Sequence, residues 1–174
     1  YYSFTNNFSI EIKFIPSSDG NYGGCEGCTH GAQLFMDGGG NLGGTDFPDI
    51  GINISDVFTD YPVIMVEFAD GNHSTHRYYS DEFVPLDTLN HIILTFSSGT
   101  LKVFLNGVNI IEETVPITEL VHNEESEATL GARNVRDEIY AGYFSHIKGL
   151  YSAFSIYDKT LTDAEISDIF QNNY

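Results

Sequence analysis

The sequence predicts an all-β protein, an antiparallel two-sheet sandwich or barrel with one short helix near its C-terminus. Three observations favour this class: apolar and polar residues alternate in many short segments, turn residues separate these segments, and a single segment has helical periodicity. The pattern does not alternate strands with helices, as a parallel sheet would require. We therefore expect neighbouring strands to run antiparallel.

The first predicted strand covers residues 8–14, where apolar residues alternate with Ser9, Glu11 and Lys13. Successive side chains of a strand point to opposite faces, so we expect the apolar ones to be buried and the polar ones to face solvent. The same criteria predict strands at Leu34–Met36, Ile50–Ile54, Val63–Phe68, His91–Phe96, Leu101–Leu105, Val108–Ile111, Thr129–Gly131 and Tyr151–Tyr157.

Turn chemistry predicts two consecutive hairpins in the middle of the chain. Ser97–Gly99 joins two strands, and Asn106-Gly107 supplies the positive φ angles of a type I′ turn. The one predicted helix follows Thr162, which forms a capping box with Glu165 ahead of apolar residues at helical spacing.

Composition limits the architecture and the partners. The 174 residues fit a single domain over 1–174, which we expect to be excised from a larger protein, and no apolar run is long enough to insert into a membrane. The 25 acidic and 7 basic residues give a formal net charge of −18, which disfavours nucleic acid and anionic lipid as partners. The oligomeric state stays open.

Several segments resemble the concanavalin A-like lectin/glucanase superfamily, and within it the laminin-G-like domains. They are the opening strand at 8–14, the hairpin at 89–107, Leu130-Gly131-Ala132 and the closing stretch at 149–166. The resemblance implies a jelly-roll sandwich of two antiparallel sheets with binding sites in loops at one rim or on a concave face. One departure is that the chain has no tryptophan, and Leu89 stands where the family has one. An aromatic platform for sugars must therefore come from tyrosine or phenylalanine.

The resemblance also implies a bound Ca²⁺ ion, since related domains hold one with acidic or amide side chains from separate loops. Asp46, before the strand at 50–54, resembles one such ligand. Asn134, Asp137 and Glu138, in the predicted loop after Ala132, resemble the others. The alternative is that these side chains are loop residues in contact with water alone.

Aromatic and cationic residues lie close together in two parts of the sequence. They could bind a sugar or an acidic ligand, or they could simply be sheet surface and core. The candidate ligand-binding residues are Arg77, Tyr78, Tyr79, Arg133, Arg136 and Tyr140.

Cys25 and Cys28 form a Cys-x-x-Cys pair with His30 nearby. This pair could be a small disulfide loop, part of a zinc site or two thiols. We interpret His91, which lies in the predicted hairpin, as a structural histidine.

The sequence contains neither the paired carboxylates of the glucanases that share this fold nor a nucleophile elbow. We therefore predict a non-catalytic binding module, secreted or displayed on a cell or virion surface, whose partner is a glycan or a cell-surface glycoprotein. The alternative is a protein-binding or structural adhesion domain of a surface or virion protein. A polysaccharide-degrading enzyme is the least favoured possibility.

Overall fold

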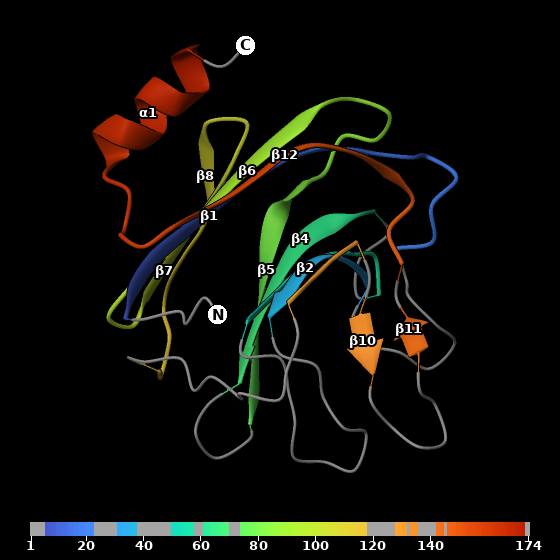
Figure 1. Cartoon of the computed structure of the whole chain (residues 1–174), viewed down its shortest axis with the longest axis horizontal. Coiled ribbons are helices and arrows are strands. Elements are labelled where there is room, and N and C mark those ends of the chain that lie inside the picture. The colour runs from blue at the N-terminus through green and yellow to red at the C-terminus, as the bar shows by residue number, and fades with distance from the viewer. Residues whose placement is uncertain are drawn as a thin grey trace. The chain divides into compact units, whose positions relative to one another are not determined.

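The computed structural model describes residues 6–22, 31–37, 50–57, 61–69, 74–117, 128–131, 133–135, 142–144 and 146–172. The predicted all-β class is confirmed: this part of the chain forms two five-stranded antiparallel sheets and one short C-terminal helix, the elements of a jelly-roll sandwich (Figure 1). The elements are β1 (Asn7–Pro16), β2 (Ala32–Asp37), β3 (Ile50–Ser55), β4 (Val63–Ala69), β5 (Thr75–Phe83), β6 (Asn90–Ser97), β7 (Thr100–Leu105), β8 (Val108–Thr114), β9 (Thr129–Leu130), β10 (Arg133–Val135), β11 (Gly142–Phe144), β12 (Gly149–Tyr157) and α1 (Asp163–Asn172).

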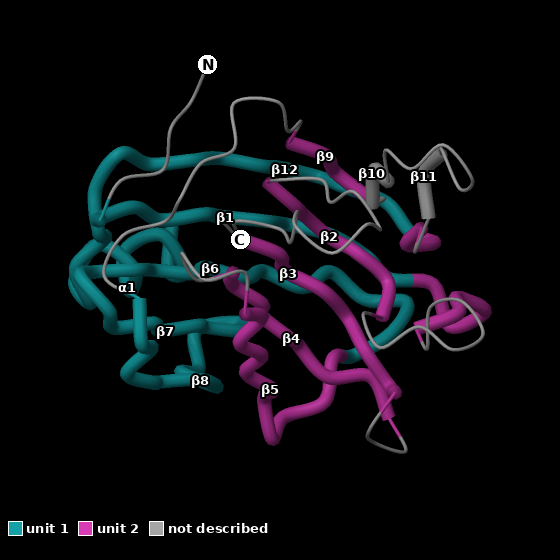
Figure 2. Tube along the Cα trace, turned by 90° about the horizontal axis from the view of Figure 1, so that it is seen from below, with its two compact units in different colours: residues 1–16, 85–119, 149–174 teal, residues 17–84, 120–148 magenta. Residues whose placement is uncertain are grey.

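The chain divides into two compact units, each with its own five-stranded sheet (Figure 2). The first unit contains residues 1–16, 85–119 and 149–174, and its sheet, sheet 1, has the strand order β12-β1-β6-β7-β8. The second unit contains residues 17–84 and 120–148, and its sheet, sheet 2, has the order β5-β4-β3-β2-β9. The hairpin of β10 and β11 also belongs to the second unit.

Both predicted hairpins of sheet 1 are confirmed. Strands β6, β7 and β8 pair in succession, and Ser98, Gly99, Asn106 and Gly107 all have positive φ angles. Two successive positive φ angles match the right-handed twist of the flanking strands, which explains why each connection is so short.

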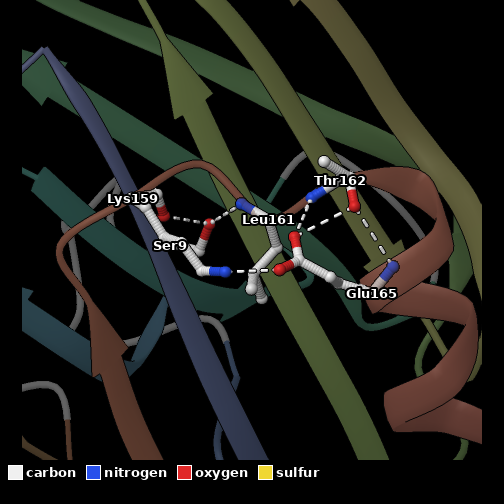
Figure 3. Close-up of polar contacts among 5 residues, drawn as sticks. All are labelled: Ser9, Lys159, Leu161, Thr162 and Glu165. Atoms are coloured by element: carbon white, nitrogen blue, oxygen red, sulfur yellow. Dashed lines mark hydrogen bonds and ion pairs between the residues drawn. The ribbon is translucent and has the colours of Figure 1, made fainter.

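Ser9 and Glu11 of β1 are buried, whereas the sequence predicted that they face solvent. The Ser9 hydroxyl donates to the carbonyl of Lys159 at 3.0 Å and accepts from the backbone N–H of Leu161 at 2.9 Å (Figure 3). Farther along the chain, α1 packs on the same sheet, where Phe170 joins a buried apolar cluster with Ile93 and three others. Segments distant in sequence thus cover the face that strand alternation alone would expose to solvent.

The predicted capping box of α1 is confirmed. Thr162 donates its backbone N–H to Glu165 Oε2 at 2.8 Å, and Glu165 donates its own N–H to Thr162 Oγ1 at 3.3 Å (Figure 3). Glu165 also forms an ion pair with Lys159. Nowhere in the described part of the chain is there a helix with the length and apolarity needed to cross a bilayer.

Acid should weaken this cap. The pKa of Glu165 is lowered from 4.5 to about 2. The largest cause is the hydrogen bond from Lys159, and the hydrogen bonds from Thr162 come next. A carboxyl whose pKa is lower in the folded state stabilises that state above the unfolded pKa, so this contribution should disappear as the pH falls from about 4.5 to about 2. We expect urea unfolding to show that Glu165→Gln is less stable than the wild type at pH 6, and that the difference shrinks by pH 2.5. A difference that stays constant with pH would contradict the assignment.

Candidate functional site

A row of polar side chains crosses sheet 2 from β2 to β5. In this polar row, Gln33 lies opposite Asn53, and Glu67 lies opposite Arg77, all on one face of the sheet with Tyr79. Strands β2, β3 and β4, which carry Gln33, Asn53 and Glu67, are otherwise mainly apolar and buried, whereas β5 is more polar and only partly buried. Since polar groups in such strands cost free energy unless they are hydrogen-bonded, their alignment on one face indicates a specific role.

Glu67 is the centre of the polar row. Its Oε1 accepts from Asn53 Nδ2 at 3.4 Å and from Gln33 Nε2 at 3.5 Å, and its Oε2 accepts from Arg77 Nε at 3.3 Å. The Glu67 side chain is 0% exposed, and that of Arg77 is 26% exposed. A buried carboxylate therefore holds a guanidinium that still reaches the surface.

Gly51 provides the space for the Glu67 side chain. It lies directly opposite Glu67 in the β3–β4 pair, and a Cβ atom at this position would come within 2.9 Å of Glu67 Cγ. Any larger residue would have to displace the carboxylate, so the glycine helps to fix the geometry of the row.

Two acceptors of the polar row accept no hydrogen bond within the structure as described. They are Gln33 Oε1 and Asn53 Oδ1, both in fully buried side chains. A buried acceptor without a donor costs about 1–3 kcal/mol. A water or a ligand hydroxyl that donated to these oxygens would remove that cost.

The row becomes more accessible towards the edge strand β5. Burial raises the pKa of the Tyr79 phenol, while the neighbouring Arg77 opposes the shift and Glu67 adds to it. Tyr79 therefore keeps its proton at neutral pH and can both donate and accept hydrogen bonds. A partly exposed guanidinium beside a protonated phenol is well suited to polar, hydroxyl-bearing ligands.

The structure brings together only some of the residues that the sequence singled out. Arg77 and Tyr79 lie on one face of β5, but Tyr78 lies on the other, where its ring meets that of Phe68 edge-on at 6.5 Å. Asn134 lies in β10, paired with Tyr143 of β11, and not in the loop that the sequence predicted. Arg133 also lies in β10. The other candidates, Cys25, Cys28, Asp46, Arg136, Asp137, Glu138 and Tyr140, are outside the described residues.

Gln33, Asn53 and Glu67 are not among the site residues that the sequence predicted. Each is a polar residue inside a run of strongly apolar strand residues. That signal was present in the sequence, but it does not show which of the three strands are neighbours or which side chains meet.

The predicted calcium ion can be tested by thermal unfolding. Among the described residues, no three His, Cys, Asp or Glu side chains form a group that could hold a metal ion. If the ion binds through Asp46 and Asp137, calcium at about 100 times its Kd should add about 2.7 kcal/mol. At about 2–4 °C per kcal/mol, the midpoint should rise by about 5–10 °C over the value in EDTA.

Asp46→Ala and Asp137→Ala should abolish this calcium response, and Asp168→Ala, a change on the exposed side of α1, should preserve it. Equal midpoints in calcium and EDTA for the wild type would refute the calcium prediction.

A family model described as the concanavalin A-like lectin/glucanases superfamily matches residues 4–167. No curated protein matches the sequence.

Solved structures with the same fold include a CBM40 domain of the Ruminococcus gnavus IT-sialidase bound to α2,3-sialyllactose. It has a TM-score of 0.70 and 16% identity, and the alignment covers 96% of this chain and 84% of that one. Domain 4 of AbnA, a GH43 extracellular arabinanase from Geobacillus stearothermophilus, in complex with arabinotriose, has a TM-score of 0.58 and 17% identity, with coverages of 97% and 68%. A heptameric SAP-like pentraxin from Limulus polyphemus has a TM-score of 0.62 and 14% identity, with coverages of 97% and 71%. At these identities the likeness is one of fold.

Proposed function

The chain belongs to the concanavalin A-like lectin/glucanases superfamily, and from this premise we propose that it is a non-catalytic carbohydrate-binding module. Two of its structural neighbours were solved with sugars, sialyllactose in the CBM40 domain and arabinotriose in the arabinanase domain. A shared fold does not fix a function, so the proposal also needs a site on this chain.

The observation that carries the proposal is the support of Arg77 by Glu67 at the accessible end of the polar row. The pair at 3.3 Å fixes the guanidinium, and Tyr79 lies beside it on the same face. A fixed guanidinium loses little conformational entropy when it binds the hydroxyl or carboxylate oxygens of a ligand. The unsatisfied oxygens of Gln33 and Asn53 provide acceptors for water or ligand hydroxyls at the buried end.

The non-catalytic part of the proposal rests on the composition of the row. Glycoside hydrolysis commonly uses two carboxyl groups about 5–10 Å apart, one as acid and the other as nucleophile or base. The polar row contains one carboxylate, that of Glu67, and three donors already engage it. Such a carboxylate is suited to holding neighbouring groups in place.

We further propose that the module is secreted or displayed on a cell or virion surface, with calcium bound near Asp46 and Asp137. One of its structural neighbours belongs to an enzyme described as extracellular. The calcium proposal depends on the family resemblance of the two aspartates.

A glycan array that contains neutral, sialylated and uronic acid oligosaccharides tests the proposed function. We expect the wild-type chain to bind a defined subset of these glycans and Arg77→Ala to bind them at least about tenfold more weakly, a loss of about 1.4 kcal/mol or more. Arg77→Lys should also bind weakly, because an ammonium keeps the charge but loses the planar set of donors. Lys102→Ala, which removes a cation from sheet 1, is the matched control and should bind as the wild type does.

Arg77→Ala leaves Glu67 buried without its charged partner, so the thermal midpoint of each variant should be measured and binding compared well below it. A blank array with the folded wild-type chain, tested with calcium and with chelator, would refute glycan binding. Persistent oligomers in solution would then favour the protein-binding alternative.

A further inference from the structure

A concave feature lies at the C-terminal end of β5, beyond the polar row. It is a depression of about 310 Å³ lined by Tyr61, Asp81, Glu82 and Phe83. This volume is at the lower end of the range for small-molecule sites. Phe83 is six residues from Arg77, up to about 20 Å along a strand, so the depression is centred away from Arg77.

A β-bulge builds this depression. Val63 pairs with Phe83 and Met65 with Tyr79, so β5 has two more residues than β4 in this interval. Ser80 takes over part of the interrupted hydrogen bonding, because its hydroxyl accepts from the N–H of Ile64 at 3.1 Å and donates to the carbonyl of Glu82 at 2.8 Å. The bulge therefore positions Asp81 and Glu82 outward in a defined arrangement.

Two aromatic side chains are exposed in the depression. Tyr61 is 48% exposed and Phe83 is 58% exposed. The segments that carry them are joined by a hydrogen bond from the N–H of Val84 to the carbonyl of Pro62 at 2.8 Å. Charged residues such as Asp81 and Glu82 are enough to protect an edge strand from pairing with another chain. Protection of the edge therefore does not explain why aromatic rings are exposed there. Exposed apolar surface in a concave feature is typical of a binding site.

The charges of the depression determine which ligands suit it. Among the described residues, the lining carries the carboxylates of Asp81 and Glu82 and no Lys or Arg. These carboxylates accept hydrogen bonds from hydroxyl groups and repel acidic ligands, whereas Arg77 attracts acidic ligands. The apolar side of a sugar ring packs on aromatic side chains that are about half exposed, whereas an ammonium ion would need a more enclosed cage.

We propose that Tyr61, Asp81, Glu82 and Phe83 form a second saccharide subsite that takes a neutral sugar unit. This inference rests on the proposed carbohydrate-binding function and adds to it a site of opposite charge on the same edge strand. The rings supply apolar contact, and the carboxylates orient the hydroxyl groups.

The absence of tryptophan from the chain permits a direct test. In Tyr61→Trp, the only indole lies in the depression, and its fluorescence can be followed during titration with lactose, arabinotriose or tetramethylammonium chloride. We expect a saturable change with at least one of the two sugars, with a Kd on the order of 1 mM. Adding Asp81→Ala and Glu82→Ala to this variant should raise the Kd for the sugar about tenfold or more, since hydrogen bonds to charged groups are the stronger ones.

Tyr151→Trp is the matched control, because it places a single indole on β12 at another exposed tyrosine. The inference is overturned if neither sugar gives a saturable change, if Tyr151→Trp responds equally, or if only tetramethylammonium binds. If the chain binds glycans on the array but Tyr61→Trp shows no fluorescence change with sugar, the second subsite is refuted and the proposed function stands. If the chain binds no glycan on the array, the proposed function itself is refuted.

Discussion

Glu67→Ala is expected to lower the free energy of unfolding by about 3–5 kcal/mol. The fully buried carboxylate accepts from Arg77, Asn53 and Gln33, so its removal leaves one charged and two amide donors of the polar row without their acceptor. Removing one partner of a buried ion pair costs more than the pair itself contributes, because the remaining charge is left without compensation. Since Arg77 is partly exposed, water can solvate it and bring the loss towards the lower end of this range.

Urea unfolding at neutral pH measures this loss. Glu112→Ala is the matched control: its carboxylate pairs with Lys102 at 3.5 Å on an exposed surface, and its removal should cost less than about 1 kcal/mol. In a double-mutant cycle, Arg77→Ala should recover part of the loss caused by Glu67→Ala. If Glu67→Ala and Glu112→Ala cost the same, Glu67 does not organise the row.

The second large effect is expected for Glu11→Ala, which should cost about 2–5 kcal/mol. Glu11 is buried, its Oε1 lies 2.8 Å from His91 Nε2, and its Oε2 accepts from the Tyr157 hydroxyl at 2.5 Å. Because a carboxylate only accepts, we assign the proton to His91 Nε2. The burial of His91 agrees with its interpretation as a structural histidine. A buried donor without an acceptor costs about 1–3 kcal/mol, so we expect the buried His91 to account for more of the loss than the partly buried Tyr157.

Proton titrations separate this role of Glu11 from simple packing. Burial lowers the pKa of His91 below 6.5, and Glu11 opposes the shift, so Glu11→Ala should lower that pKa further. Burial, reinforced by Glu11, raises the pKa of Tyr157 to about 12, and the same substitution should bring it back towards 10. Histidine NMR titration and tyrosinate absorbance measure the two values. Glu11→Gln, which still offers an oxygen to Tyr157, should lose less stability, and unchanged pKa values in Glu11→Ala would contradict the assigned network.

The Glu11 network also connects sheet 1 to the helix. The ring of Phe170 on α1 lies 4.5 Å from that of His91. Loss of Glu11 should therefore loosen the docking of α1, and limited proteolysis near the C-terminus would detect this change.

Most of the secondary structure could be predicted from the sequence because its signals are local. Alternation identified the main strands, Asn106-Gly107 identified a tight turn, and Thr162 with Glu165 identified the start of the helix. The structure set the bounds of β5, Thr75–Phe83, which was not among the strands predicted with bounds, and added the hairpin of β10 and β11, whose three-residue strands are too short to show a period of two.

The candidate site was predicted only at its edge. Arg77 and Tyr79 were identified from residue type, but alternation along β5 places Tyr78 on the opposite face. Glu67 could not be connected to Arg77 from the sequence, because ten residues separate them and strand pairing decides their contact.

The sequence by itself determined the all-β class, the hairpins and the capped helix, since each depends on residues only a few positions apart. The tertiary structure alone decided which polar groups are buried and what they meet. Ser9 contacts Leu161 across 152 positions, and Glu11 contacts Tyr157 across 146. The physical reason is that a strand presents two faces, and only the segments that pack on each face determine whether a polar side chain there meets water, a partner or a ligand.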